Sequence, residues 1–594
     1  MSNNKSSLVI FILFVVVAIG ILISQLVPNF ANFNFGSIAA NINRPVTEIS
    51  IVYAPESESY LKDAINDFNS SFDSGTNPVT GEKLKDGDKK IKVTGKPGSS
   101  GTVRTAIVNA VNGSNTAQVE KPTIFSPSVG SWLGLVNYET GREVFKMNEA
   151  VPTANAPVVI AIWESRLNLI KDKNPGKEIG WQELIQVLND PQGWLSYSPT
   201  VGRKKVYYGH TDPQVSSTGL STLISEFYAS SRYLSGNTNQ EQLTLATVND
   251  PKVKDGVKSI ESLIKHYSSR TTEFKEYIAQ GPQYLDFVAL EENDLIYINQ
   301  GKAQSKPPEK LIALYPKEGT TIHEHPFGIV NASWVSEEQA AAAKVFTDYV
   351  ISEKVQQKVL ENGFRPVNDK VALGYPLTKE LGVDIDQPKT ILNTPTPEVI
   401  SAVQQNWNLV KKRSEVYMLL DNSGSMDGEP LSNAIKAMRT FVEKLPIQNQ
   451  VGLTVFNTDV TELTPLQSLE SNQGKLNATL NEITADGSTA LYDGLYQTLD
   501  TLNKNTDPNN QSIRAIILLS DGKDTSSGKN LSDVVNLINE IKKGDNPIFV
   551  IPIAYGKEAD LNALNAIARA SDTRVQFGDV KDIESLLAVI SSYF

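Results

Sequence analysis

The 594-residue sequence contains no cysteine and carries a net charge of −12. Without cysteine the chain has no disulfide, no thiol nucleophile and no residue that could hold the lipid of a lipoprotein anchor. An acidic chain also lacks the basic footprint that nucleic acid requires, so we expect no nucleic-acid partner. The hydrophobic content of 40% is nevertheless that of a folded globular protein.

Catalytic motifs are missing as well. The sequence has no G-x-S-x-G element, and the glycine-rich stretch Gly98–Thr102 lacks the Gly-Lys-Ser/Thr ending of a phosphate-binding loop. The pair Glu291-Glu292 is typical of solvated surface rather than of an acid/base dyad. His323-Glu324-His325 offers two imidazoles to zinc, but no third or fourth ligand lies nearby. We therefore expect a binding protein and not an enzyme.

One long apolar run stands near the N-terminus. Leu8–Ile23 is almost wholly apolar and continues weakly to Val27, close to the roughly 20 residues that span a bilayer. Lys5 precedes the run, and no Lys or Arg follows it before Arg44, so the N-terminus is expected in the cytoplasm. A cleaved signal peptide is the rival interpretation, but the run is long and no small-x-small site follows closely.

The N-terminal segments are therefore predicted to be an anchor over residues 1–29, spanning at 8–27, and a spacer over residues 30–46. A large animal extracellular protein without cysteine would be unusual, whereas a bacterial one with adequate cores needs no disulfide. We expect a single-pass protein of the bacterial cytoplasmic membrane, with the bulk of the chain on the periplasmic or extracellular side.

Residues 47–395 alternate between strand and helix patterns, which predicts an α/β domain with a mostly parallel sheet. The predicted strands are Ile49–Ala54, Ile91–Thr94, Val158–Trp163, Val206–Gly209 and Leu311–Tyr315. The predicted helices are Tyr60–Phe68, Thr102–Val111, Trp181–Leu188, Thr218–Tyr233 and Glu337–Leu360.

Small hydroxyl-rich loops recur where these elements meet, and each is either an anion-binding loop or a plain helix cap. Their hydroxyl residues are Ser99, Ser100, Ser126, Ser128, Ser217 and Thr218. Further short stretches accompany them, at 156–161, 181–184, 210–213, 315–320, 326–327 and 363–366. Together this region resembles the type 2 periplasmic solute-binding proteins, most closely the branch that handles sulfate, molybdate and related oxyanions. The resemblance implies two α/β lobes and a small anion held by these hydroxyls in the cleft between them.

A linker over residues 396–413 is expected next, because the alternating Thr and Pro residues of Thr394-Pro395-Thr396-Pro397 are typical of an extended segment between domains. After it, an apolar strand at 416–420 runs into Asp421-Asn422-Ser423-Gly424-Ser425, and a helical pattern follows at 431–445. Thr489 opens a later helical pattern, and Asp521 ends a second apolar strand. Since ligands collect at the carboxyl ends of parallel strands, Asp421 and Asp521 can converge on one site.

This D-x-S-x-S, T, D pattern resembles the metal-ion-dependent adhesion site of the von Willebrand factor type A domain, which implies a Rossmann-like, doubly wound domain over residues 414–594. The resemblance assigns Mg²⁺ or Mn²⁺ to Asp421, Ser423, Ser425, Thr489 and Asp521, since hard oxygen ligands suit these ions. It also implies one open coordination position that a Glu or Asp of a partner protein fills. Asp459 lies in a nearby loop, where a solvated role is expected.

Two functional hypotheses follow. The first is a membrane-anchored, envelope-facing protein that binds another protein through the metal, with an oxyanion-sensing cleft in the middle domain. The alternative is the solute-binding receptor of an oxyanion uptake transporter, with the last domain as an accessory.

Overall fold

The computed structural model describes residues 44–114, 118–234, 242–268, 270–504, 512–544, 546–556, 558–579 and 582–594. The predicted anchor at residues 8–27 and the spacer up to residue 43 lie outside the described residues. Among the described helices, none has both the length and the apolar composition needed to cross a membrane.

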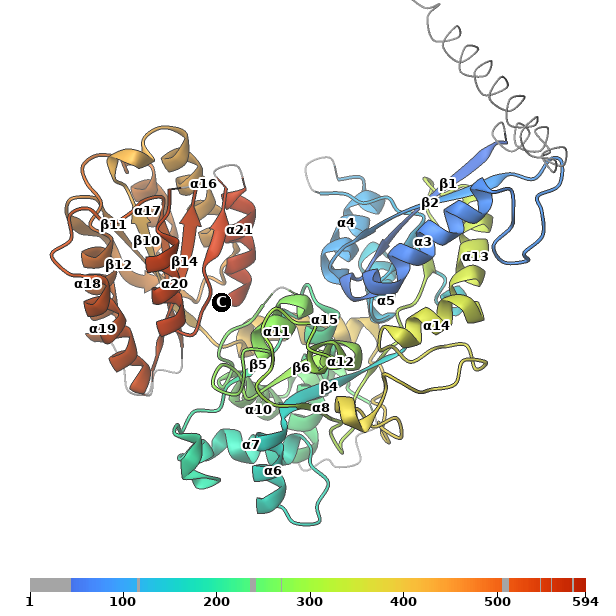
Figure 1. Cartoon of the computed structure of the whole chain (residues 1–594), viewed down its shortest axis with the longest axis horizontal. Helices are drawn as coiled ribbons and strands as arrows, with labels where there is room; N and C mark the ends of the chain where they lie inside the picture. Colours follow the sequence, from blue (N-terminus) through green and yellow to red (C-terminus); the bar gives the residue numbers. More distant parts are fainter. Residues whose placement is uncertain are drawn as a thin grey trace, which may run out of the picture.

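The described residues form three sheets with helices packed around them, which confirms the α/β class. A four-stranded sheet builds the first lobe of the middle region, a five-stranded sheet builds its second lobe, and a six-stranded sheet builds a separate C-terminal domain (Figure 1). We call these parts lobe 1, lobe 2 and the C-terminal domain.

Lobe 1 has the strand order β2-β1-β3-β9, in which β1 pairs in parallel with β2 and β3 while β9 runs antiparallel to β3. Its strands are β1 Val46–Tyr53, β2 Lys90–Pro97, β3 Ile124–Ser126 and β9 Gly328–Ile329. Its helices are η2 Pro55–Ser57, α3 Glu58–Asp73, α4 Ser100–Asn112, α5 Ser131–Thr140, η3 Met147–Glu149, α13 Glu337–Val350 and α14 Glu353–Glu361. The single helix predicted over Glu337–Leu360 is thus two helices, because Ser352 adopts an extended conformation that caps α14.

Lobe 2 has the strand order β5-β6-β4-β7, with β8 paired to β4, and it is mostly antiparallel, unlike the parallel sheet that was predicted. Its strands are β4 Ala156–Trp163, β5 Tyr208–Gly209, β6 Phe287–Glu291, β7 Leu311–Leu314 and β8 Ile322–His323. Its helices are α6 Glu164–Lys173, α7 Trp181–Asn189, η4 Gly193–Ser196, η5 Pro199–Val201, α8 Ser217–Leu234, α9 Leu245–Asn249, α10 Pro251–Glu261, α11 Thr271–Ile278, α12 Glu292–Asn299 and η6 Lys379–Leu381.

The predicted linker is instead mostly a helix, α15, over Pro397–Val410. The Thr-Pro pattern starts the helix: the Thr396 hydroxyl accepts the Val399 N–H at 3.5 Å, and Pro397 occupies the first turn, where its missing N–H costs nothing. Trp407 is 2% exposed, and α15 packs against α5 of lobe 1 and α8, α9 and α10 of lobe 2, so it is part of the core and not a spacer.

The C-terminal domain has the strand order β12-β11-β10-β13-β14-β15, parallel except for β12, with helices on both faces. Its strands are β10 Ser414–Asp421, β11 Gln450–Phe456, β12 Val460–Ser468, β13 Ile513–Ser520, β14 Ile548–Tyr555 and β15 Gln576–Gly578. Its helices are η7 Gly424–Met426, α16 Glu429–Lys444, α17 Leu469–Leu480, α18 Leu491–Lys504, α19 Leu531–Lys543, α20 Leu561–Ala570, α21 Ile583–Ile590 and η8 Ser591–Tyr593. Every residue of β10 and β13 is buried, as expected for central strands covered on both faces.

The last residues of the chain join the C-terminal domain to lobe 2. The Tyr593 hydroxyl lies 3.1 Å from the Tyr277 hydroxyl of α11, and the Tyr593 carbonyl accepts the Tyr267 N–H at 3.3 Å. Figure 1 shows the C-terminus on the side of its domain that faces α11.

Candidate functional site

The five residues predicted to bind metal come from loops at one edge of the C-terminal sheet. Asp421 is the last residue of β10 and Asp521 directly follows β13, and these strands are parallel neighbours with Leu420 opposite Leu519. Register alone therefore brings the two carboxylates to the same edge. Gly424 donates its N–H to the Gly487 carbonyl at 3.1 Å, which draws in the loop that carries Thr489.

Four of these residues form one chain of polar contacts. The Asp421 Oδ1 accepts the Ser423 N–H at 2.9 Å, and the Ser423 and Ser425 hydroxyls lie 3.1 Å apart. The Ser425 hydroxyl in turn donates to Asp521 Oδ1 at 2.8 Å. The structure thus brings Asp421, Ser423, Ser425 and Asp521 together, as the sequence predicts.

Thr489 lies near the same group of oxygen side chains, next to the residue that follows Asp521. It is 6% exposed, and a Cβ built on Gly522, next to Asp521, would lie 3.9 Å from the Thr489 hydroxyl. Thr525 holds the loop in place, because its hydroxyl accepts the Thr489 N–H at 2.9 Å and its own N–H donates to the Thr489 carbonyl at 2.8 Å.

The donor set fits a hard divalent cation. Neighbouring oxygens of an octahedral Mg²⁺ site, each about 2.1 Å from the ion, lie roughly 3 Å apart. The separations of 3.1 Å between Ser423 and Ser425 and 2.8 Å between Ser425 and Asp521 match this spacing. Burial raises the pKa of both aspartates, and the charge of Asp521 raises the pKa of Asp421 further, so a cation between them would be stabilised.

Ser520 is a supporting residue that the sequence pattern did not single out. Its hydroxyl donates to Asp421 Oδ2 at 2.7 Å, so both oxygens of that buried carboxylate are held in place. Its position at the end of β13, one residue before Asp521, is the signal that could have revealed it. Asp459 is exposed on the neighbouring loop, as expected.

The predicted oxyanion residues lie where lobe 1 meets lobe 2, and we call this contact the seam. The Ser217 hydroxyl of α8 donates to the Ser100 hydroxyl of α4 at 3.0 Å and accepts the Trp132 indole N–H at 2.9 Å. The Gly101 N–H donates to the Val215 carbonyl at 2.9 Å, and a Cβ on Gly101 would lie only 2.1 Å from the Gln214 carbonyl oxygen. The lobes therefore touch directly, backbone to backbone.

The other predicted hydroxyls are placed differently. Ser126 is buried, and its hydroxyl has no hydrogen-bond partner among the described residues. Ser128 is also buried, and its carbonyl accepts the His325 N–H at 2.9 Å. The Thr218 hydroxyl accepts from Thr271 at 3.2 Å, while Ser99 precedes α4 without forming a side-chain cap. The six residues thus lie at the seam or its flanks, and Ser100, Ser217 and Thr218 bond protein side chains there.

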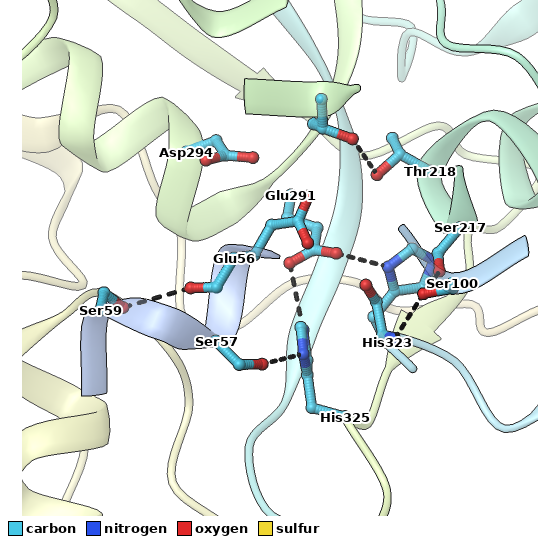
Figure 2. Close-up of polar contacts among 12 residues, drawn as sticks. Glu56, Ser57, Ser59, Ser100, Ser217, Thr218, Glu291, Asp294, His323 and His325 are labelled. Carbon is cyan, nitrogen blue, oxygen red and sulfur yellow. Dashed lines mark hydrogen bonds and ion pairs between the residues drawn. The ribbon is translucent and has the colours of Figure 1, made fainter. Parts of the chain in front are cut away.

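A buried carboxylate that the sequence interpretation placed on the surface lies at the centre of the seam. Glu291, at the end of β6, binds His323 Nδ1 through Oε1 at 2.7 Å and His325 Nε2 through Oε2 at 3.2 Å (Figure 2). The Ser57 hydroxyl contacts His325 Nδ1 at 2.8 Å, and the Ser221 hydroxyl contacts His323 Nε2 at 2.8 Å. Both imidazoles therefore bind the Glu291 carboxylate. The apolar run before Glu291 was the signal for a buried strand.

Two more carboxylates stand beside Glu291 in Figure 2. Asp294 is buried and pairs with Lys275 at 3.2 Å, yet no described residue forms a hydrogen bond with its Oδ2. Glu56, from lobe 1, is partly buried, and the described residues offer it no ion-pair partner. Burial, together with the charges of Glu291 and Asp294, raises the pKa of Glu56 to about 8. Burial also acts on Glu291, but the two histidines outweigh it and lower the pKa to about 2.

Family models match the two parts of the chain separately. The model of the bacterial extracellular solute-binding protein matches residues 52–365, and the model of the von Willebrand factor type A domain matches residues 415–589. Among curated proteins, the inter-alpha-trypsin inhibitor heavy chain H4 of Homo sapiens is 28% identical over 145 residues, which are 24% of this chain and 16% of that protein. Heavy chain H1 of Bos taurus is 24% identical over 176 residues, or 28% of this chain and 19% of that protein. The chain thus spans less than a fifth of the length of these relatives.

Solved structures of both kinds of domain also match parts of the chain, with low TM-scores and low sequence identity. A von Willebrand factor type A protein from Catenulispora acidiphila has a TM-score of 0.28 and 18% identity, covering 31% of this chain and 42% of that chain. The sulfate-binding protein SubI from Mycobacterium tuberculosis has a TM-score of 0.36 and 16% identity, covering 55% and 88%. A periplasmic thiamin binding protein has a TM-score of 0.39 and 13% identity, covering 62% and 97%.

Proposed function

The chain belongs to the bacterial extracellular solute-binding proteins and carries a von Willebrand factor type A domain, and from this premise we propose that it binds a partner protein in a metal-dependent way. It acts in this proposal as a binding protein and not as an enzyme. The family assignment supports a binding role for both parts. The metal, its ligands and the partner are the proposed elements.

The observation that carries the proposal is the oxygen group at the edge of the C-terminal sheet. Asp421 and Ser423 are buried and fixed, while Ser425 is exposed and Asp521 is only partly buried, so the group opens to solvent on one side. Mg²⁺ or Mn²⁺ held there would supply a coordination position for an incoming carboxylate. The proposed partner therefore presents a Glu or Asp at this face.

We place the protein at the outer side of the bacterial cytoplasmic membrane, anchored once through residues 8–27 with its N-terminus inside. The apolar run, the charge on its cytoplasmic flank and the extracellular character of the solute-binding family support this location.

A pull-down from detergent-solubilised membranes tests the proposal. The full chain should capture a partner in Mg²⁺ and release it in EDTA, and Asp421→Ala should capture none in either buffer. Asp459→Ala removes an exposed carboxylate on the neighbouring loop and should behave like the wild type. A partner retained equally by Asp421→Ala would refute the metal bridge.

We further propose that the seam takes a small cationic ligand, in place of the oxyanion that the sequence predicted. Ser100 and Ser217 already bond each other, and the seam also holds the carboxyl groups of Glu56 and Asp294, whose pKa values are raised by burial and whose charged forms a cation would stabilise. Thermal unfolding should then respond to small amines such as putrescine but not to sulfate or molybdate, and Glu56→Gln should remove the response. A shift with oxyanions alone would restore the uptake-receptor alternative.

A further inference from the structure

A polar cavity lies at the junction of lobe 2 and the C-terminal domain and shares no lining residue with either site above. One part measures about 340 Å³ and the other about 860 Å³, and both are lined by Lys204, Lys205 and Tyr207. We call the two parts together the junction cavity. Small-molecule sites typically measure about 300–1,000 Å³, so each part is large enough for a ligand.

The junction cavity is basic, although the whole chain carries a net charge of −12. Its charged lining residues are Asp190, Asp572, Arg203, Lys204, Lys205, Lys265, Lys412, Lys542 and Lys543. Arg203 pairs with Asp286 at 2.7 Å, and Lys542 pairs with Asp572 at 2.6 Å. For Lys204, Lys265, Lys412 and Lys543, by contrast, the part of the chain that the structure describes provides no carboxylate within ion-pair distance. Basic side chains therefore outnumber acidic ones in the described lining by seven to two.

Two of these lysines are held inside the junction rather than in solvent. Lys265 is 3% exposed, and its ammonium donates to the Tyr284 carbonyl at 2.9 Å and lies 3.7 Å from the centre of the Tyr284 ring. The Lys412 ammonium donates to the Ile264 carbonyl at 2.7 Å. A buried ammonium without a counter-ion is costly, which disfavours its charged form.

The pKa of each lysine follows from this setting. Burial lowers the pKa of Lys265 to about 7; Arg203 and Lys542 lower it as well, while Asp572 and Asp286 oppose the shift. Burial also lowers the pKa of Lys412 to about 7, with a smaller contribution from Lys205. An anion in the junction cavity would favour the charged form of both side chains.

We propose that the junction cavity binds a small anion with two or three linked phosphoryl groups. Several uncompensated lysines suit a multiply charged ligand, and lysine binds phosphate as a point charge without a fixed geometry. Lobe 2 supplies Lys204 and Lys265, the segment after α15 supplies Lys412, and the C-terminal domain supplies Lys543 and the Asn546 amide. A bound anion therefore ties the two domains together at this junction.

Isothermal titration of inorganic tripolyphosphate into the full chain, in EDTA, tests this proposal without involving the metal site. The wild type should bind one anion per chain, and the double variant Lys204→Glu/Lys543→Glu should bind at least tenfold more weakly. Both substituted side chains are exposed, so folding should be preserved. The control Lys444→Glu/Lys475→Glu makes the same charge change at exposed positions of the C-terminal domain outside the cavity and should leave binding unchanged.

Two further readouts separate this site from a general electrostatic attraction. Binding near pH 7.5 should take up protons, seen as a dependence of the heat on buffer ionisation enthalpy, and affinity should fall between pH 6 and pH 8 as Lys265 and Lys412 lose their charge. Flotation with phosphatidylglycerol vesicles, whose headgroup carries a single phosphate, distinguishes a lipid headgroup from a soluble polyphosphate: we expect the wild type not to float with the vesicles. The proposal is overturned if tripolyphosphate does not bind, if only the vesicles bind, or if both double variants weaken binding equally.

Discussion

Replacing Asp421 with Asn tests whether the oxygen group at the edge of the C-terminal sheet binds a metal. The substitution should not lower the stability of the domain without metal, but it should abolish the stabilisation that metal provides. The Asp421 carboxylate is 0% exposed, accepts bonds from Ser423 and Ser520, and lies beside the charge of Asp521. Burial and the charge of Asp521 raise its pKa, so without a bound cation the ionised carboxylate costs more free energy in the folded chain than in the unfolded one. Asn keeps the shape and removes the charge, so the metal-free variant should be at least as stable as the wild type.

Mg²⁺ should reverse this order. At a Mg²⁺ concentration 100 times the dissociation constant, binding to the folded state alone stabilises the domain by about 2.7 kcal/mol. For a domain of this size, each kcal/mol shifts Tm by about 2–4 °C, so the wild-type transition should rise by roughly 5–10 °C and the variant hardly at all. Scanning calorimetry of the full chain, following the C-terminal transition, measures both shifts. Asp459→Asn serves as the control and should match the wild type. Equal Mg²⁺ shifts in wild type and Asp421→Asn would refute the reasoning.

Three further perturbations follow from the contacts. Ser520→Ala frees one oxygen of Asp421 and should weaken Mg²⁺ binding by about 10–100-fold in a titration; an unchanged affinity would mean that Ser520 does not orient the carboxylate. Gly101→Ala places a methyl group against the backbone of lobe 2, so the lobes should separate and the radius of gyration in X-ray scattering should increase; an unchanged radius contradicts the close seam. Glu291→Gln leaves two buried imidazoles without their carboxylate and should cost about 3–5 kcal/mol in chemical unfolding. Because the folded pKa of Glu291 is lowered to about 2, this difference should be full above pH 4.5 and shrink as pH falls toward 2; a difference that does not depend on pH would contradict the assignment.

The oxygen group at the edge of the C-terminal sheet was predictable from sequence because its geometry is set locally. Asp421 ends β10 and the next four residues add Ser423 and Ser425, while parallel strand pairing places Asp521 at the same edge. Two parallel strands that each have an Asp at the carboxyl end are therefore enough to predict that the two carboxylates converge. The contact of Ser520 with Asp421 was not predictable, because a serine at the end of a buried strand has many ordinary roles.

The seam could not be predicted in the same way. Glu291 meets His323 and His325 only because β6 and β8 both pair with β4, and antiparallel pairing between distant segments is not visible in a local pattern. A pair of adjacent glutamates is usually solvated, so the surface prediction followed the common case and was wrong for this strand end. The predicted linker failed for another reason, because Thr-Pro marks a helix start as readily as an extended segment.

Water-proton relaxation with Mn²⁺ tests the central claim, an adhesion-type metal site with a free coordination position, most directly. Adding Mn²⁺ to the metal-free full chain should enhance the relaxation rate of water, because the bound ion keeps exchangeable water, and a peptide carrying a Glu should reduce that enhancement by displacing it. Asp421→Ala should show no enhancement. An enhancement that persists in Asp421→Ala, or one that no carboxylate reduces, would contradict the account.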